Sequence, residues 1–309
     1  MAWATGSSPG SDILAATAIK RWQLTIGDRD TSFLMHPTIR AGWMDESDFL
    51  QAVAEEVPVI GLGLDMLAPE VESAEANELT PSGTSYPLTP ARKAGKMTVS
   101  GLYRIEDGMV LANYDVLAFA MFLGGQRRLM ADIAALFPSI TNIVGSTGVT
   151  LSWSVLKSAV DTNFAAGSRG QQVALLADKQ WREVSNDALT LGGAIEHQPE
   201  MQGFMGGSRG FSFKGIYLNG DLAVYAADDN IITDDGTDYS GAVFGPEAFG
   251  IKTRAPQPDP AAQEVARMGW MMAELERNAS IDDTEVVVTG YTAAAIAQNT
   301  AACEVLSVK

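Results

Sequence analysis

A long polar stretch, residues 70–96, constrains the fold of this chain more than any other feature. It has almost no large apolar side chains, and it contains Pro81, Pro87 and Pro90. Loops longer than about 12–15 residues are uncommon in compact domains and are usually functional or disordered. Because proline lacks a backbone donor and favours extended backbone, we expect a projecting loop or an edge-type hairpin in place of a central strand. A solvated loop without a role is the alternative.

The rest of the chain is long enough to bury a large core. With 309 residues, of which 46% are hydrophobic and 19% charged, one large domain or two closely joined domains are expected. The single cysteine, Cys303, cannot form an intramolecular disulfide, and we expect a small apolar filler in a terminal strand. Residues 1–10 lack the pattern of a secretory signal, and no segment has the length and apolarity of a membrane span. We therefore expect a soluble protein made in the cytoplasm.

The net charge of −17 arises from 38 acidic and 21 basic residues. Such an acidic chain is poorly suited to neutralising phosphates, so direct nucleic-acid recognition is not expected. The inner wall of a DNA container is a different case, because a wall that repels the polymer does not stick to it. The charge is compatible with that role.

The hydrophobic periodicity predicts helices interspersed with strands. Helices are expected at residues 44–59, at 113–137 with a kink or break at Gly124-Gly125, at 152–164 with Gly167 as the stop, and at 259–277 after Asp259-Pro260. Strands are expected at residues 173–177, 285–288 and 305–308, and a hairpin at 211–225 turns at Asn219-Gly220, with residues 192–210 irregular. The order lacks the strand–helix alternation of a doubly wound sheet, so the predicted class is α+β.

One short pattern in the sequence could belong to a catalytic site. Residues 206–210 match the serine nucleophile elbow, which makes Ser208 a candidate for a serine hydrolase. Both histidines, His36 and His197, precede Ser208, whereas that fold supplies its base later in the chain, and the flanks lack the required strand and helix. We expect both histidines to be loop or interface residues and the pattern to be a flexible turn, like the related residues 167–170.

Other binding chemistry also lacks support in the sequence. One cysteine and two distant histidines cannot form a zinc site. The carboxylates at residues 228–238 depart from the calcium-loop spacing and predict a solvated acidic turn. Gly61-Leu62-Gly63 lacks the third glycine of a dinucleotide fingerprint. We expect no catalytic residue, no cofactor and no metal.

Several segments, taken in order, resemble a known family. Residues 96–100 look like the strand that leads out of an extended loop before a long helix, and residues 215–217 and 243–250 are similar to the return from one domain to another. This order resembles the major capsid protein of tailed bacteriophages, with the Hong Kong 97-type (HK97-like) fold. The resemblance implies an N-terminal arm at 1–63, an extended loop at 64–100 and a peripheral domain with its spine helix at 101–139. It further implies an axial domain at 140–250 and a return to the peripheral domain at 251–309, where the family would place a strand pair at residues 265–275.

The function that the resemblance implies is structural. The chain would be the subunit of an icosahedral phage capsid, would assemble in the host cytoplasm into hexamers and pentamers, and would enclose double-stranded DNA in the virion without sequence-specific binding. Scaffolding, portal and decoration proteins would be its partners, besides itself. Candidate inter-subunit contacts are Tyr86, Arg92, Lys93 and Lys96, because a projecting hairpin with basic residues can meet acidic neighbours. The alternatives are an encapsulin-like compartment shell, another virion protein such as a tail-tube or decoration protein, and the hydrolase using Ser208.

Overall fold

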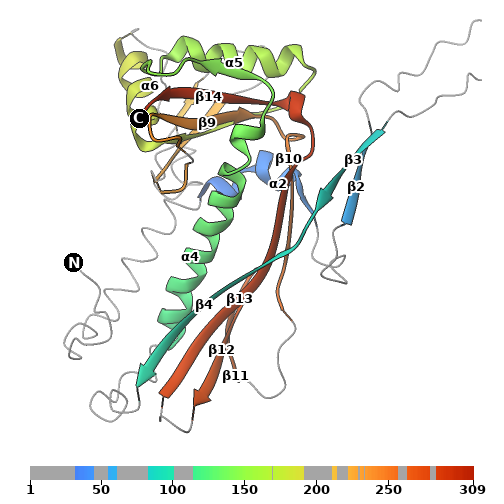
Figure 1. Ribbon diagram of the computed structural model, residues 1–309, viewed down its shortest axis with the longest axis vertical. Helices are drawn as coiled ribbons and strands as arrows, with labels where there is room; N and C mark the ends of the chain where they lie inside the picture. Colours follow the sequence, from blue (N-terminus) through green and yellow to red (C-terminus); the bar gives the residue numbers. More distant parts are fainter. Residues whose placement is uncertain are drawn as a thin grey trace, which may run out of the picture.

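The computed structural model describes residues 32–44, 55–60, 83–100, 114–168, 170–190, 211–213, 222–228, 230–232, 234–256, 263–278 and 283–309. Across this part of the chain the molecule is elongated (Figure 1). One end holds a sheet of long strands with a long helix beside it, and the other end holds a second sheet with two helices. A two-stranded ribbon leans away from the body. The predicted α+β class is confirmed.

The first sheet is organised by its longest strand, β13. Strand β4 pairs with one edge of β13, while β12 and then β10 pair with successive parts of the other edge. Because β13 meets all three, its register aligns segments that are far apart in the sequence. The six strands are β1 (Trp43–Met44), β4 (Ala91–Ser100), β10 (Phe249–Arg254), β11 (Gln263–Met268), β12 (Met271–Asn278) and β13 (Asp283–Ile296).

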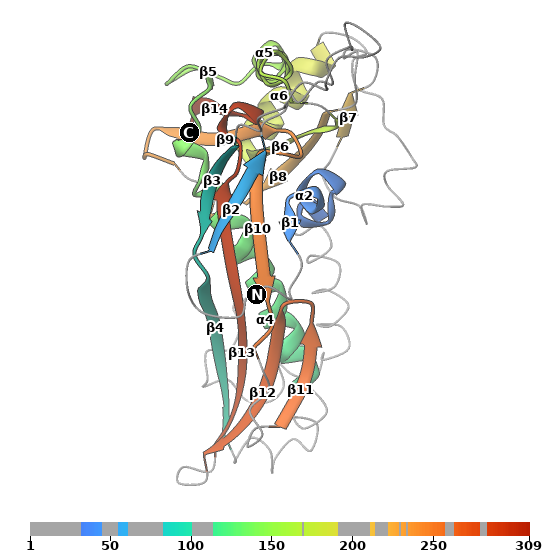
Figure 2. The ribbon, with the colours of Figure 1, turned by 90° about the vertical axis from the view of Figure 1, so that its right-hand side faces the viewer.

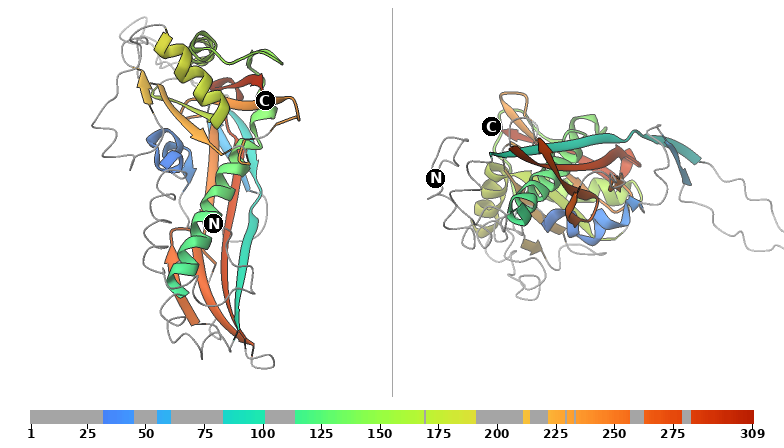
Figure 3. Two further views of the ribbon diagram at one scale, coloured as in Figure 1. Left: turned by 90° about the vertical axis from the view of Figure 1, so that its left-hand side faces the viewer. Right: turned by 90° about the horizontal axis from the view of Figure 1, so that it is seen from below.

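Helix α4 (Tyr114–Ala134) lies along one face of this sheet, as Figure 3 shows. The long helix predicted from the periodicity is confirmed, with Leu129, Met130 and Ile133 almost fully buried. The chain stays helical through Gly124-Gly125, so neither a break nor two helices occurs there. Packing explains why position 125 is a glycine, because a Cβ there would overlap the Met271 side chain of β12. A Cβ on Gly124 would meet no atom within 4 Å.

The helix predicted at residues 259–277 is wrong. Residues 263–278 form the hairpin β11–β12, which turns at Gly269, whose φ of +56° suits glycine. Pairing with β13 along Met271–Asn278 overrides the helix propensity of the alanine, methionine and glutamate residues. The strand pair that the family resemblance implied is therefore the correct one, and the start of the predicted helix, residues 259–262, lies outside the described residues.

The second sheet has the order β5-β14-β9-β6-β8-β7 (Figure 2). Strand β6 is buried along its whole length, as predicted for residues 173–177, and its side chains alternate between two cores: Val173 and Leu175 face one, Ala174 and Leu176 the other. The sheet is thus covered on both faces. Its strands are β5 (Ile143–Gly145), β6 (Gln172–Ala177), β7 (Phe211–Phe213), β8 (Leu222–Ala227), β9 (Asp238–Phe244) and β14 (Ala302–Val308).

Two helices cover one face of the second sheet. The predicted helix at residues 152–164 is confirmed as α5 (Trp153–Ala165), which is followed by Gly167 at φ +98°. Helix α6 (Asp178–Thr190) was not predicted, and it holds the start of α5: Glu183 Oε2 accepts from Leu151 N at 2.9 Å, and Asp187 Oδ2 accepts from Trp153 N at 2.7 Å. Carboxylates of α6 therefore accept from the first backbone donor of α5 and from the backbone just before it.

The opposite face of the second sheet packs against three short elements and the end of α4. Phe33 makes edge contacts with Tyr225 and Phe244, at ring-centroid distances of 5.7 and 6.0 Å. This aromatic core joins the N-terminal part of the described chain to β8 and β9. The short elements are η2 (Ser32–Met35), α2 (Pro37–Ala41) and η5 (Phe137–Ser139), while a further 3-10 turn, η6 (Asn299–Ala301), precedes β14.

The predicted hairpin at residues 211–225 exists with a different register. Strand β7 pairs with β8 so that Phe213 lies opposite Leu222, whereas a two-residue turn at Asn219-Gly220 would place Tyr217 opposite Leu222. The predicted turn at Asn219-Gly220, within residues 214–221, and the irregular stretch predicted at 192–210 lie outside the described residues.

The projecting ribbon pairs β2 (Glu55–Ile60) with β3 (Gly83–Leu88). The helix predicted at residues 44–59 is wrong where it overlaps β2, and residues 45–54 lie outside the described residues. The ribbon confirms an edge-type hairpin for the described part of residues 70–96, with Pro87 in a strand that has one partner strand. Only Thr89 and Pro90 separate β3 from β4, so the chain passes directly from the ribbon into the long sheet.

Strand pairing joins segments that are distant in the sequence. Residues 55–60 pair with β3 in the ribbon, and residues 91–100 pair with β13 in the long sheet. Strand β14 lies in the second sheet between β5 and β9. Long-range strand pairing decides these positions, and it leaves little trace in local composition.

Candidate functional site

The three basic residues singled out in the sequence lie on β4. Their side chains alternate: Lys93 points to helix α4, where its Nζ lies 2.6 Å from Asp132 Oδ2, while Arg92 and Lys96 belong to the opposite, exposed face. Lys96 Nζ lies 2.9 Å from Glu285 Oε1 on β13. Lys93 and Lys96 thus have acidic partners within their own chain, and Arg92 has no ion-pair partner among the residues that the structure describes.

Tyr86, the fourth candidate, anchors the ribbon to its own chain. Its side chain is buried with Leu88 of β3 and Ala293 of β13. The contact with Gly250 is so close that a Cβ there would lie 2.6 Å from Tyr86 Cζ. Burial raises the pKa of the Tyr86 hydroxyl. Tyr86 therefore fixes the root of the ribbon.

Asp132 of α4 completes the charged cluster beside β4. Besides Lys93, it pairs with Arg128, whose Nε lies 3.2 Å from Asp132 Oδ1. Two cations therefore share this carboxylate. Sequence reasoning missed Asp132 and Glu285 as partners of β4, because each is distant in the chain from the β4 lysine it meets. The only signal for either was the strand predicted at residues 285–288.

The structure does not support the serine-hydrolase arrangement. Ser208 and His197 lie outside the described residues, but the segment after the glycine-rich pattern, Phe211–Phe213, is a strand, whereas a nucleophile elbow needs a helix there. In the related residues 167–170, Gly167 and Gly170 adopt positive φ, and Arg169 lies outside the described residues.

His36 lies in the bend between η2 and α2, as expected for a loop residue, and its side chain is buried. Its side chain is 3% exposed, and its Nδ1 accepts a hydrogen bond from Thr38 N at 3.2 Å at the start of α2. The ring packs edge-on against Tyr225 with a centroid distance of 5.8 Å. Burial lowers the pKa of His36 from 6.5 to about 4, so the imidazole is neutral at pH 7.

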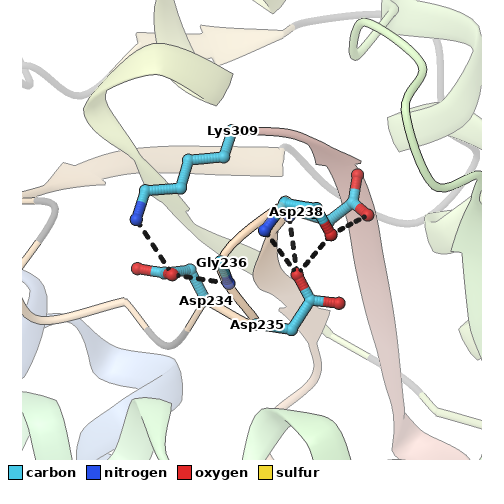
Figure 4. Close-up of polar contacts among 6 residues, drawn as sticks. Asp234, Asp235, Gly236, Asp238 and Lys309 are labelled. Carbon is cyan, nitrogen blue, oxygen red and sulfur yellow. Dashed lines mark hydrogen bonds and ion pairs between the residues drawn. The ribbon is translucent and has the colours of Figure 1, made fainter.

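The acidic cluster forms a self-contained turn (Figure 4). Asp235 Oδ1 accepts from the backbone of Thr237 and Asp238, at 2.9 and 2.7 Å, and Asp234 accepts from Gly236 N and from Lys309 Nζ. These hydrogen bonds lower the pKa values of Asp234 and Asp235. The solvated acidic turn is confirmed at Asp235, whereas Asp238 is buried and accepts from Gly148 N at 2.7 Å.

Cys303 is fully buried in β14, as expected for an apolar filler, and burial raises the pKa of its thiol to about 12. Within the described ranges, no group of three or more histidine, cysteine or acidic side chains is arranged to hold a metal ion. No helix in those ranges combines the length and apolarity needed to cross a membrane.

The long sheet with a helix on one face, the second sheet between two cores and the projecting ribbon define an HK97-like capsid fold. Solved structures share this arrangement. The chain is similar to the capsid of Helicobacter pylori bacteriophage KHP30, with a TM-score of 0.56, 10% identity and 87% of each chain covered. It is also similar to the capsid of an empty GTA particle, with a TM-score of 0.50, 14% identity and 91% of each chain covered.

An encapsulin has the same fold. The chain is similar to the SrpI encapsulin of Synechococcus elongatus, with a TM-score of 0.51, 10% identity and 87% of each chain covered. Comparison of the sequence itself with family models and with curated proteins gives no match. The predicted HK97-like fold is confirmed by structure, and at these identities the comparisons establish the fold alone.

Proposed function

We propose that this protein is a structural shell subunit, the major capsid protein of a bacteriophage. The observation that carries the proposal is the fold match to the KHP30 capsid, which covers 87% of both chains. The subunits would self-assemble into hexamers and pentamers of an icosahedral shell. The role would be structural and not catalytic.

The elements fit the parts of such a subunit with adjusted boundaries. The ribbon β2–β3 would be the extended loop, so that residues 55–90 replace the expected 64–100. Helix α4 would be the spine helix of a peripheral domain that includes β4 and the sheet strands β10–β13. The second sheet with α5 and α6 would be the axial domain, and it would include β14. The N-terminal arm would end before β2.

The content of the shell distinguishes two versions of this function. A capsid would enclose double-stranded DNA in the virion, whereas an encapsulin-like compartment would enclose a protein, and the similarity to SrpI supports the second version. The net charge of −17 favours DNA, because an acidic wall repels the polymer and keeps it mobile. Scaffolding, portal and decoration proteins would be partners of the first version only.

Electron microscopy of the purified protein tests the proposal. We expect closed particles or ring-shaped oligomers, with a scaffolding protein from the same genome if the chain alone does not close. Particles made during infection should protect double-stranded DNA from nuclease, and an encapsulin-like shell should protect a protein instead. A chain that stays monomeric at all concentrations and salt conditions, with or without scaffold, would contradict the proposal.

A further inference from the structure

The face of the first sheet that lies away from α4 carries a group of arginines. Arg92 on β4 and Arg254 on β10 both pair with Tyr291 of β13, so the three side chains form one row across three strands. Lys93, the neighbour of Arg92, meets Asp132 of α4, and the alternation along β4 therefore puts the row on the face away from the helix. Figure 2 looks onto this face, with α4 behind the strands.

A third arginine lies on the same face in the next row. Arg267 of β11 pairs with Met272 of β12, which pairs with Thr289 of β13, two residues before the row of Arg92 and Arg254. The guanidinium of Arg267 donates to Met272 Sδ at 3.4 Å. We call the three arginines the arginine patch. The two rows that it spans contain no carboxylate among the described residues.

The arginine patch is accessible and has an excess of positive charge. Arg92 and Arg267 are exposed, and Arg254 is half-buried. Within the described part of the chain, neither Arg92 nor Arg254 pairs with a carboxylate. The first carboxylates on this face lie beyond the patch: Glu274 one row away, and Glu285, which already pairs with a lysine of β4, two rows away. A local excess of cations is unusual in a chain whose net charge is −17.

The chemistry of the row suits anionic oxygens. A guanidinium is planar, keeps its charge at any working pH, and offers paired donors that match the oxygens of a phosphate or a carboxylate. Arg92 and Arg254 lie two strand spacings apart, about 10 Å, since neighbouring strands are separated by about 4.8 Å. The hydroxyl of Tyr291 between them is a further donor. The row can therefore bind a ligand that carries several anionic oxygens.

A line of phosphates fits the arginine patch better than a single carboxylate. One carboxylate occupies one guanidinium fork, whereas a DNA strand presents a charge about every 3.4 Å along its axis and can meet several arginines at once. The shell function proposed above would place this polymer beside the subunit. The total charge predicted no nucleic-acid recognition, but the fold gathers cations that are spread through the sequence from residue 92 to residue 267.

We propose that the arginine patch binds phosphate groups, which in the shell are those of the enclosed DNA backbone, without reading the base sequence. The proposal rests on the DNA-enclosing version of the shell function. The acidic remainder of the subunit repels the polymer, so the patch is a local point of contact on a surface that otherwise does not bind DNA. Binding through phosphates releases counterions, so the affinity falls steeply with salt.

Binding of a short DNA duplex to the unassembled subunit, measured by fluorescence anisotropy at several salt concentrations, tests the proposal. If the three arginines each contact a phosphate, a roughly fourfold rise in salt should weaken wild-type binding about 40-fold, because each contact contributes a slope of about −0.9 on logarithmic scales. Arg92→Gln with Arg254→Gln leaves one contact, so the same rise should weaken its binding only about threefold to fourfold. Two duplexes of unrelated sequence should bind equally.

A matched control separates the patch from net charge. Lys157→Gln with Arg182→Gln removes the same charge from α5 and α6, where both side chains are exposed, and its salt dependence should equal that of the wild type. Arg92→Lys with Arg254→Lys keeps the charges and therefore the slope, but it loses the paired donors, so its affinity should be lower at every salt concentration. A control pair that loses the slope as fully as the arginine pair would overturn the proposal.

Two further ligands identify the source of the phosphate. Inorganic phosphate that raises the melting temperature of the wild type, and not that of the arginine variant, would show that a single ion is sufficient. A response to the duplex alone would show that the polymer is required, and both results support the patch. Poly-glutamate that binds the wild type as tightly as the duplex, and fails to bind the arginine variant, would assign the patch to an acidic protein and contradict the proposal.

The arginine variant should fold, because among the described residues neither guanidinium has an ion pair to lose. Circular dichroism and thermal unfolding check this. If the double variant unfolds, Arg92→Gln alone replaces it, and a roughly fourfold rise in salt should then weaken binding about 12-fold.

The assay on the unassembled subunit keeps the two proposals apart. A wild-type subunit that binds neither the duplex nor phosphate at low salt, or an arginine variant with the wild-type slope, shows that the phosphate site is wrong while the shell function stands. Wild-type protein that never assembles contradicts the shell function instead.

Discussion

Buried His36 should make the subunit less stable in mild acid. In the folded chain its pKa is about 4, and in the unfolded chain it returns to 6.5. Between these values the unfolded state binds the proton and the folded state does not. The free energy of unfolding is therefore highest above pH 6.5 and falls as the pH drops towards 4. The full difference between the two pKa values corresponds to a loss of about 3 kcal/mol in the free energy of unfolding, since one pKa unit is worth about 1.4 kcal/mol.

The structural reason lies in the contacts of the imidazole. A proton on Nδ1 removes the acceptor for Thr38 N and places a charge against the Tyr225 ring in a core that excludes water. At pH 5 the loss relative to pH 8 should be about 2 kcal/mol. The segment released first should be residues 32–44, which packs on the second sheet and adds β1 to the first.

Urea unfolding of the unassembled chain at pH 8 and pH 5 measures this loss. His36→Asn keeps an acceptor at the helix start but does not titrate, so its free energy of unfolding should fall by about 2 kcal/mol less than that of the wild type. Equal pH dependence in the wild type and His36→Asn would refute the reasoning, because the carboxylates titrate identically in both.

Three further predictions concern packing. Gly124→Ala should raise the free energy of unfolding by about 1 kcal/mol through helix propensity. Gly125→Ala should have a lower free energy of unfolding than Gly124→Ala, because its Cβ overlaps a core methionine, and thermal unfolding of the two variants checks this. Gly250→Ala should cost about 1–3 kcal/mol by displacing Tyr86, and much less in a Tyr86→Ala background, as a double-mutant cycle would show. Cys303 should react with a thiol reagent only after unfolding, since its thiol is buried with a pKa of about 12; fast labelling of the folded chain would contradict this.

The elements that could be predicted from sequence are those specified locally. Helix α5 has its apolar spacing and a stop at Gly167 within one segment, and β6 has an uninterrupted apolar run. The helix predicted over residues 263–278 was wrong because helix propensity is a local property, whereas the pairing of these residues with β13 depends on residues from 283 onward. The same limit applied to the site: the cations of β4 stood out in composition, but their partners are distant in the sequence. Glu285 is brought to β4 by strand register, and Asp132 by the packing of α4 on the sheet.

The pairing of β13 also connects the cations of β4 to the root of the ribbon. Its residues 283–292 hold β4, which carries Arg92, Lys93 and Lys96, and its residues 291–296 hold β10, whose Gly250 receives Tyr86. The cations and the root of the ribbon are therefore fixed to the same strand. A shift of β13 by one residue would turn its own side chains, Glu285 among them, to the opposite face of the sheet and break the Lys96–Glu285 ion pair. The register of the sheet thus sets the direction of the ribbon relative to β4, which is the geometric condition for a subunit that would meet copies of itself at a fixed angle in the proposed shell.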